Sequence, residues 1–312
     1  MPAEDFNRPA SGPYADLDAL IALRFPARQI DIRRRRALSR MTGGNRSSAR
    51  GRGIDFDEVR SYQPGDDIRA IDWRVTARTG SAHTKLYHEE RERPVLIAVD
   101  QRAGMFFGSR HCFKSVLAAH LAALLAWSGL NCGERVGGMV FGNDTHRDIR
   151  PRRSRNAALG LLSTIVDFNH RLHAPGADTA EGFADVLGKC RRIARPGASL
   201  IIVSDFDGLL QPRAREHLYQ LSRHVEIAAL HCTDPLEHQL PPPGEYAVSD
   251  GNRRSTLATT AAALRRQYAR EASDYHAAIA DTLQRAGVPC RMATTDDAPF
   301  PLLRDLYEGR RR

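Results

Sequence analysis

Acidic, basic and aromatic side chains lie unusually close together between residues 52 and 93, which we call the signature segment. Its residues Gln63 to Asp66 have the chemistry of a turn, because proline presets φ, glycine accepts a positive φ and aspartate bonds its own backbone. Carboxylates and guanidinium groups beside such a turn could serve acid–base chemistry, an ion-pair network or a binding surface. The candidate functional residues of the segment are Arg60, Tyr62, Gly65, Asp66, Asp67, Arg69, Asp72, Trp73 and Arg78.

Two interpretations of the signature segment predict different exposures. In the first, its charges form a structural ion-pair network, and Tyr62 and Trp73 anchor it in the core against a sheet, since buried charges need partners. In the second, the segment docks a partner protein, for which tyrosine, tryptophan and arginine are the usual anchors. The two can hold together, but a docking anchor stays accessible in the free protein and a structural anchor does not.

The elements after residue 93 alternate between strands and helices. Two apolar runs, residues 94–99 and 199–204, predict strands buried on both faces, and they end at Asp100 and Asp205. Further strands are expected at 85–92, 135–141, 225–231 and 288–293, a hairpin at 245–257, and helices at 17–25, 110–128, 154–168, from Thr179, and at 213–222, 259–286 and the C-terminus. This order predicts an α/β fold with an open, mostly parallel sheet flanked by helices. Ligands of such sheets collect beyond the carboxyl ends of the strands, which directs attention to the two aspartates.

Composition divides the chain into three regions. Residues 1–27 contain proline, serine and glycine and are expected to form a flexible N-terminal segment; residues 28–93 hold an arginine-rich helix and loop followed by the signature segment; and residues 94–312 form the α/β domain with a C-terminal helical extension. The net charge is +9, carried almost wholly by arginine. Five widely spaced cysteines fit a reducing cytoplasm. No signal peptide pattern is present, and residues 116–127 fall short of the roughly 20 needed to span a bilayer, so direct membrane insertion is not expected.

The signature segment resembles a bacterial family of unknown function, domain-of-unknown-function family 58. The matching positions are Gly51, Gly53, Asp55 (for a glutamate), Phe56, Arg60, Tyr62, Gly65, Asp66, Asp67, Arg69, Ile71, Asp72, Trp73, Ala77 and Arg78. Residues around Asp100, 233–246 and 300–307 also look like this family, so the resemblance runs from about Arg28 onward. It implies a fold similar to the von Willebrand factor type A domain and a partnership with a MoxR-type AAA+ ATPase.

That resemblance also implies where a metal would lie. Such domains hold a divalent cation with a D-x-S-x-S motif, a threonine and a second aspartate, and here Asp100, Thr179 and Asp205 stand at three of the five positions. Both serines are missing, because the motif reads Asp-Gln-Arg-Ala-Gly. Arg102 would repel a divalent ion about 4 Å away by roughly 8 kcal/mol at an effective dielectric constant of 20. We therefore expect Arg102 to replace the metal by pairing with Asp100 or Asp205, which disfavours Mg²⁺ and leaves no expected cofactor.

Two other functions remain open at this point. The run IIVSDFDGLL looks like the nucleophile motif of haloacid-dehalogenase phosphatases, with Asp205 as nucleophile and Asp207 as acid and base, although Leu209 stands where that family has threonine. A metal-dependent phosphatase or nuclease could add Asp72. The arginines between residues 33 and 52 could instead bind nucleic acid, but no aromatic residues are interleaved among them for stacking.

The interpretation that accounts for most of these features is a cytoplasmic protein-interaction module without enzymatic activity. In this interpretation its partners are a MoxR-type AAA+ ATPase and a client protein, and its work is the assembly or maturation of other proteins. The metal motif is degenerate, and the signature segment supplies the docking residues.

Overall fold

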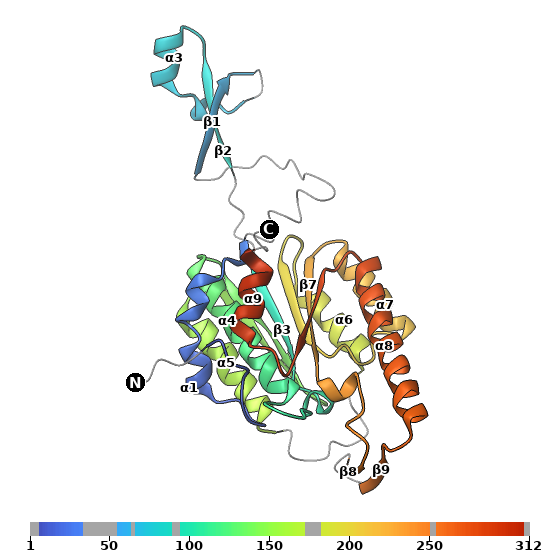
Figure 1. Ribbon diagram of the computed structural model, residues 1–312. Coiled ribbons are helices and arrows are strands. Elements are labelled where there is room, and N and C mark those ends of the chain that lie inside the picture. Colours follow the sequence, from blue (N-terminus) through green and yellow to red (C-terminus); the bar gives the residue numbers. More distant parts are fainter. Residues whose placement is uncertain are drawn as a thin grey trace. The chain divides into compact units, whose positions relative to one another are not determined.

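The computed structural model describes residues 6–33, 55–63, 66–88, 94–171, 182–249 and 254–308 (Figure 1). The chain divides into two compact units. The smaller unit is Ala37–Glu92, and the larger unit joins Met1–Arg36 with Arg93–Arg312. The region predicted as residues 28–93 therefore begins, as a compact unit, at Ala37.

A mostly parallel sheet forms the centre of the larger unit. Its strands within the described ranges are β3 (Val95–Asp100), β4 (Val136–Phe141), β5 (His146–Arg152), β6 (Ser199–Ser204), β7 (Glu226–Thr233) and β10 (Cys290–Thr294). They lie in the order β10-β7-β6-β3-β4-β5, and only the edge strand β5 runs antiparallel to its neighbour. The predicted α/β fold with an open, mostly parallel sheet is confirmed.

Helices cover both faces of this sheet, so its central strands are buried on both sides. The helices are α1 (Leu17–Ala22), η1 (Pro26–Gln29), α4 (Lys114–Asn131), α5 (Arg155–Asn169), α6 (Phe183–Ile193), α7 (Pro212–Ser222), α8 (Ala262–Arg285) and α9 (Pro299–Glu308). One apolar cluster joins the sheet to α1, η1, α4, α5 and α9, and a second joins it to α6, α7 and α8 (Figure 1). Alternate residues of β3 enter the two clusters, Ile97 the first and Leu96 the second, because successive side chains of a strand point to opposite faces.

The N-terminal residues belong to this core. Leu20 and Ala27 are fully buried, and Nε1 of Trp127 in α4 donates a hydrogen bond to the carbonyl oxygen of Leu20 at 3.0 Å. The prediction of a flexible segment over residues 1–27 was therefore wrong for residues 6–27. Helix α4 is apolar almost all round its circumference, so it needs cover on the side away from the sheet as well as on the side against it.

The C-terminal part follows the predicted order of elements. A hairpin of β8 (Glu245–Ser249) and β9 (Arg254–Ala258) precedes α8, and β10 then returns to the edge of the main sheet before α9. Two short 3-10 helices, η3 (Ala103–Met105) and η4 (Pro235–Glu237), follow the carboxyl ends of β3 and β7. No helix in the described ranges combines the length and the apolar character needed to cross a membrane.

The smaller unit is built on an antiparallel pair of strands, β1 (Asp55–Ser61) and β2 (His83–His88). Between them lie η2 (Ile68–Ala70) and α3 (Trp73–Thr79), and each begins at an aspartate whose side chain accepts backbone N–H groups. Helix α3 ends at Gly80, whose φ of 76° lies in the left-handed region that glycine adopts most readily. The predicted arginine-rich helix and loop before β1, between residues 31 and 52, lie almost wholly outside the described residues.

Candidate functional site

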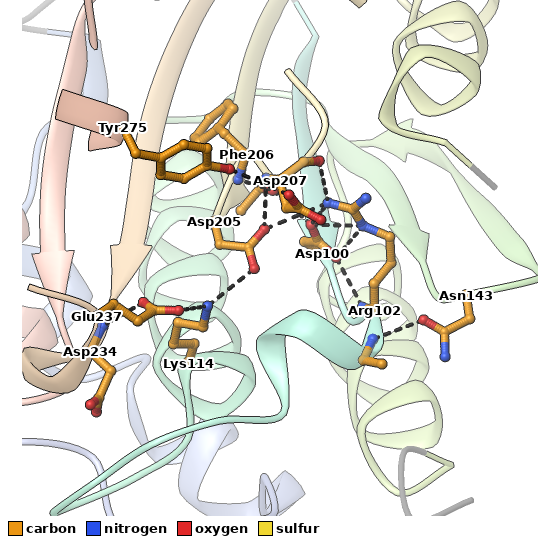
Figure 2. A network of polar contacts seen from close by, with 12 residues as sticks. Asp100, Arg102, Lys114, Asn143, Asp205, Phe206, Asp207, Asp234, Glu237 and Tyr275 are labelled. Carbon is orange, nitrogen blue, oxygen red and sulfur yellow. Dashed lines mark hydrogen bonds and ion pairs between the residues drawn. The ribbon is translucent and has the colours of Figure 1, made fainter. Parts of the chain in front are cut away.

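Asp100 is the last residue of β3, and its carboxylate is held by an arginine two residues later in the chain (Figure 2). The Asp100 side chain is fully buried. Its Oδ2 accepts hydrogen bonds from Arg102 Nη2 at 2.7 Å and Ser204 Oγ at 2.6 Å, while Arg102 Nε lies 3.1 Å from both oxygens. Burial raises the pKa of Asp100, and the guanidinium of Arg102 acts against that rise.

Asp205 follows the neighbouring strand β6 and contacts two cationic side chains. Its Oδ2 accepts a hydrogen bond from Lys114 Nζ at 3.1 Å, and its Oδ1 lies 3.6 Å from Arg102 Nη2. Burial would raise the pKa of Asp205, but Lys114 and Arg102 together hold it below the usual value. The backbone turns sharply here, since Phe206 has a φ of 59°, and this turn lets Asp205 Oδ1 accept the N–H of Asp207 at 3.0 Å.

Lys114 extends this chain of opposite charges to the end of β7. It is the first residue of α4 and is almost completely buried, and its Nζ donates to Glu237 Oε1 at 2.6 Å. The other oxygen of Glu237 accepts the backbone N–H of Asp234 at 2.9 Å, closing a capping box around η4. Asp100, Arg102, Asp205, Lys114 and Glu237 thus alternate in charge across the carboxyl ends of three strands (Figure 2). We call these five residues the charge chain.

Further hydrogen bonds fix the outer side of the charge chain. Arg102 Nη2 also donates to the backbone oxygen of Asp207 at 3.3 Å, and the hydroxyl of Tyr275 donates to Asp207 Oδ1 at 3.3 Å. Asn143 Oδ1 accepts the N–H of Ala103 at 2.8 Å (Figure 2). The loops after β3, β4 and β6 and the helix α8 are therefore tied to one another at this edge of the sheet.

The residues at this edge do not fit a divalent metal. Arg102 and Lys114 occupy oxygens of Asp100 and Asp205 that would have to bind the ion, and both carry positive charge. Position 104 faces the same carboxylate, because a Cβ added to Gly104 would lie 3.0 Å from Asp205 Oδ2, but glycine offers no hydroxyl there. No group of three or more histidine, cysteine, aspartate or glutamate side chains within the described ranges has a metal-binding arrangement.

The predicted pairing of Arg102 with Asp100 or Asp205 is confirmed, and Arg102 in fact contacts both. The third position implied by the resemblance, Thr179, lies outside the described residues. The proposed phosphatase nucleophile, Asp205, is 11% exposed, and both of its oxygens accept hydrogen bonds. Asp72, the third acid of that alternative, accepts the N–H groups that open α3 in the smaller unit.

Sequence reasoning missed Lys114, Glu237 and Tyr275. Lys114 is one of only three lysines in the chain and lies two residues before the most apolar run, residues 116–127. A lone lysine at the start of a buried helix needs an acidic partner, so this signal was available. Nothing in the spacing of Glu237 or Tyr275 identified them.

The signature residues lie in the smaller unit, where several of them hold its local structure. Arg60 Nη2 forms an ion pair with Asp66 Oδ1 at 2.7 Å, and Asp66 Oδ2 accepts the N–H of Gln63 at 2.9 Å. Asp67 and Asp72 are the N-caps of η2 and α3. Gly65 lies outside the described residues. The predicted ion pairing is therefore confirmed for Arg60 with Asp66, while Asp67 and Asp72 have a structural role as helix N-caps.

The aromatic residues of the signature segment differ in exposure. Tyr62 is half-buried, whereas Trp73 is 68% exposed and Arg69 and Arg78 are also exposed. Trp73 is therefore not a buried anchor within the smaller unit. Trp73 is the first residue of the short helix α3, and its side chain is exposed while those of Val75 and Thr76 are half-buried.

Residues 58–278 match the family described as "Protein of unknown function DUF58". An uncharacterized protein of Mycobacterium bovis and one of Mycobacterium tuberculosis are each 30% identical to the chain over 247 residues, which cover 79% of this chain and 76% of the relative.

Two solved structures resemble the chain weakly. The conserved hypothetical protein BatB of Bacteroides thetaiotaomicron is 14% identical, with a TM-score of 0.34 over 62% of this chain and 98% of that chain. An aerotolerance-related membrane protein of Bacteroides fragilis is 15% identical, with a TM-score of 0.36 over 69% of this chain and 99% of that chain. At these TM-scores the likeness supports no statement about function.

Proposed function

The chain belongs to the DUF58 family, and we propose that it is a protein-interaction module without catalytic activity of its own. In this proposal it acts in the cytoplasm with a MoxR-type AAA+ ATPase in the assembly or maturation of a client protein. The ATPase partner comes from the resemblance of the signature segment. In this proposal, from the same resemblance, the larger unit is a von Willebrand factor A-like domain in which the charge chain takes the place of the metal.

The exposure of Trp73 is the observation that carries the interaction role. Its side chain is 68% exposed, and Ile68, five residues earlier, is 66% exposed. Tryptophan contributes more than most residues to binding energy at protein interfaces, and leaving it in water forgoes the gain from burying a large apolar surface. The acidic residues beside it already cap helices or pair with arginine, so they shape the surface that presents Trp73.

The charge chain supports a role other than catalysis. A nucleophile or a general base needs an oxygen that a substrate can reach. Asp100 is fully buried, and both oxygens of Asp205 are bound by groups of the protein itself. Lys114 and Arg102 are in turn held by the carboxylates, so the network serves to join strand ends.

The test is a direct binding measurement with a purified MoxR-type AAA+ ATPase from the same organism. Trp73→Ala should weaken binding by at least about tenfold, the loss typical of an interface anchor. Tyr219→Ala is the matched control, because Tyr219 is an aromatic residue of the larger unit that is 57% exposed. Its removal should change the dissociation constant less than about twofold. Circular dichroism would establish that both variants are folded.

Two results would contradict the proposal. Absence of binding by the wild-type chain would remove the ATPase partnership, and equal losses in the two variants would remove the role of Trp73. Hydrolysis of p-nitrophenyl phosphate that disappears in Asp205→Asn would show that the chain is an enzyme.

A further inference from the structure

One side of α3 presents exposed residues that include a tryptophan and two arginines. At 3.6 residues per turn, Trp73, Arg74, Ala77 and Arg78 fall within an arc of about 140°, and all four are exposed. Val75 and Thr76 lie outside this arc and are half-buried. Oγ1 of Thr76 accepts the backbone N–H of His83 in β2 at 3.1 Å, so the side of the helix that holds these two residues faces β2.

The outward side is positively charged. Arg69, in η2 just before α3, is exposed together with Arg74 and Arg78. Among the described residues, none of these three arginines forms an ion pair, in contrast to Arg60, which is bound by Asp66. We call Ile68, Arg69, Trp73, Arg74 and Arg78 the α3 face. It combines two exposed apolar side chains with three guanidinium groups that have no carboxylate partner in the described part of the chain.

Charge argues against another copy of this chain as the occupant of the α3 face. The range Ala37–Glu92 holds ten basic and nine acidic residues, so nearly all of the net charge of +9 lies in the larger unit. A second copy, or the chain's own larger unit, would on average bring positive charge toward these arginines. A like-charged partner lowers both the rate and the strength of association.

The apolar part of the α3 face favours a protein over a nucleic acid. Surfaces that bind single strands use aromatic side chains in succession along the strand. The α3 face instead places its indole with the aliphatic Ile68. An isoleucine side chain gains burial against apolar side chains of a protein and gains little against phosphates. The three arginines are compatible with a protein partner, because a guanidinium group pairs with the carboxylates of aspartate and glutamate as it does with phosphates.

We propose that the α3 face binds an acidic segment of a partner protein that also carries apolar side chains. The apolar residues of that segment cover Trp73 and Ile68, and its carboxylates meet Arg69, Arg74 and Arg78. This inference rests on the proposed interaction function and adds the chemical class of the partner. The proposal predicts that binding weakens as salt rises, because the arginines are solvent-exposed and the screening length of salt is about 10 Å at 0.1 M and shorter at higher concentrations.

The experiment uses the full chain labelled with 5-fluorotryptophan. The chain has only two tryptophans, Trp73 and Trp127, so each gives its own resonance. A short synthetic peptide of glutamate and leucine is the probe, and the same peptide with lysine for glutamate is its control. In ¹⁹F NMR the resonance of exposed Trp73 should shift on addition of the acidic peptide, while that of buried Trp127 stays in place. An oligothymidine strand of similar length tests the nucleic-acid alternative.

Charge-neutral variants locate the binding surface. Arg74→Gln with Arg78→Gln should weaken peptide binding by about tenfold, as expected for the loss of two exposed ion pairs. Arg266→Gln with Arg270→Gln is the matched control, because these exposed arginines have the same spacing on α8. Glutamine keeps the helix propensity of the position, so the fold of α3 is preserved.

The outcomes separate this inference from the proposed function. Equal binding of the lysine peptide, tighter binding of oligothymidine, or no effect of the Arg74 and Arg78 changes would overturn the acidic partner. If the ATPase still loses affinity through Trp73→Ala, the interaction function stands without it. If the acidic peptide binds as expected and the ATPase does not, the α3 face stands and the ATPase partnership fails.

Discussion

Replacement of Arg102 by methionine should destabilise the larger unit in a manner that depends on pH. Methionine has a similar length and no charge, so the substitution leaves Asp100 fully buried beside Asp205 without its guanidinium partner. Breaking a buried pair by removing one partner typically costs about 3–5 kcal/mol, because the remaining charge is uncompensated.

Protonation of Asp100 sets an upper limit to this loss. A carboxyl group whose pKa is raised in the folded state keeps its proton in the folded chain, whereas the unfolded chain releases that proton above about pH 3.9. The contribution of this group to the stability of the fold is therefore lost as pH rises. At pH 7 holding that proton costs about 4 kcal/mol, which is about 1.4 kcal/mol for each of roughly three pH units. At pH 5 the same proton costs only about 1.5 kcal/mol. The deficit of Arg102→Met should therefore be at most about 4 kcal/mol at pH 7 and should shrink by more than half at pH 5.

Urea denaturation of the wild type and the variant at pH 5 and pH 7 measures this deficit. Subtracting the two free energies of unfolding at each pH removes the contribution of titratable groups that both chains contain. In a separate thermal melt at pH 7, the upper limit of about 4 kcal/mol corresponds to a fall in melting temperature of at most about 8–16 °C. The double variant Asp100→Asn with Arg102→Met should recover most of the stability, since both charges are then gone. The exposed Arg266→Met is the control for loss of an arginine. A deficit below about 1 kcal/mol at pH 7, or equal deficits at pH 5 and pH 7, would refute the reasoning.

Three further predictions concern the same unit. Burial is the main cause that lowers the pKa of His231 to about 3. The stability that neutral His231 contributes is therefore present above the unfolded pKa of 6.5 and is lost as pH falls, by about 2 kcal/mol at pH 5. Urea titrations of His231→Phe should lack that loss. Arg102→Ser with Gly104→Ser restores two hydroxyls and removes the guanidinium group that contacts Asp100 and Asp205, which leaves Lys114 as the one cation of the charge chain. Calorimetry should then detect Mg²⁺ binding that the wild type does not show, and absence of binding in both chains would contradict the replacement of metal by arginine. Gly138→Ala places a methyl group against the backbone of β3, so the free energy of unfolding should fall by about 1–3 kcal/mol; an unchanged urea midpoint would show that the strands can separate.

The fold was predictable from local patterns. Buried parallel strands read as continuous apolar runs, and this marked β3 and β6 with their bounding aspartates. The N-terminal segment was not predictable in the same way. The helix expected at 17–25 is present as α1, but its burial in the core was not predictable, because six residues are too few to show which face is apolar.

The candidate site was predictable only in part. Asp100 and Arg102 are two residues apart, and their pairing follows from chain proximity and opposite charge. Lys114 contacts Asp205 across 91 residues and Glu237 across 123 residues. Contacts of that separation depend on which strand ends and helix ends the fold brings together, and a single sequence contains no periodicity that reports them.

The sequence alone determined the sheet, the aspartates at its carboxyl edge, the missing hydroxyls of the metal motif and the membership of the signature segment in a family. These are local properties, because strand burial, turn chemistry and motif identity depend on residues close in the chain. Only the tertiary structure decided that Lys114 and Glu237 complete the charge chain and that Trp73 faces outward. Burial and long-range pairing are properties of the packed chain, in which the orientation of one helix decides whether a tryptophan stabilises a core or remains available to a partner.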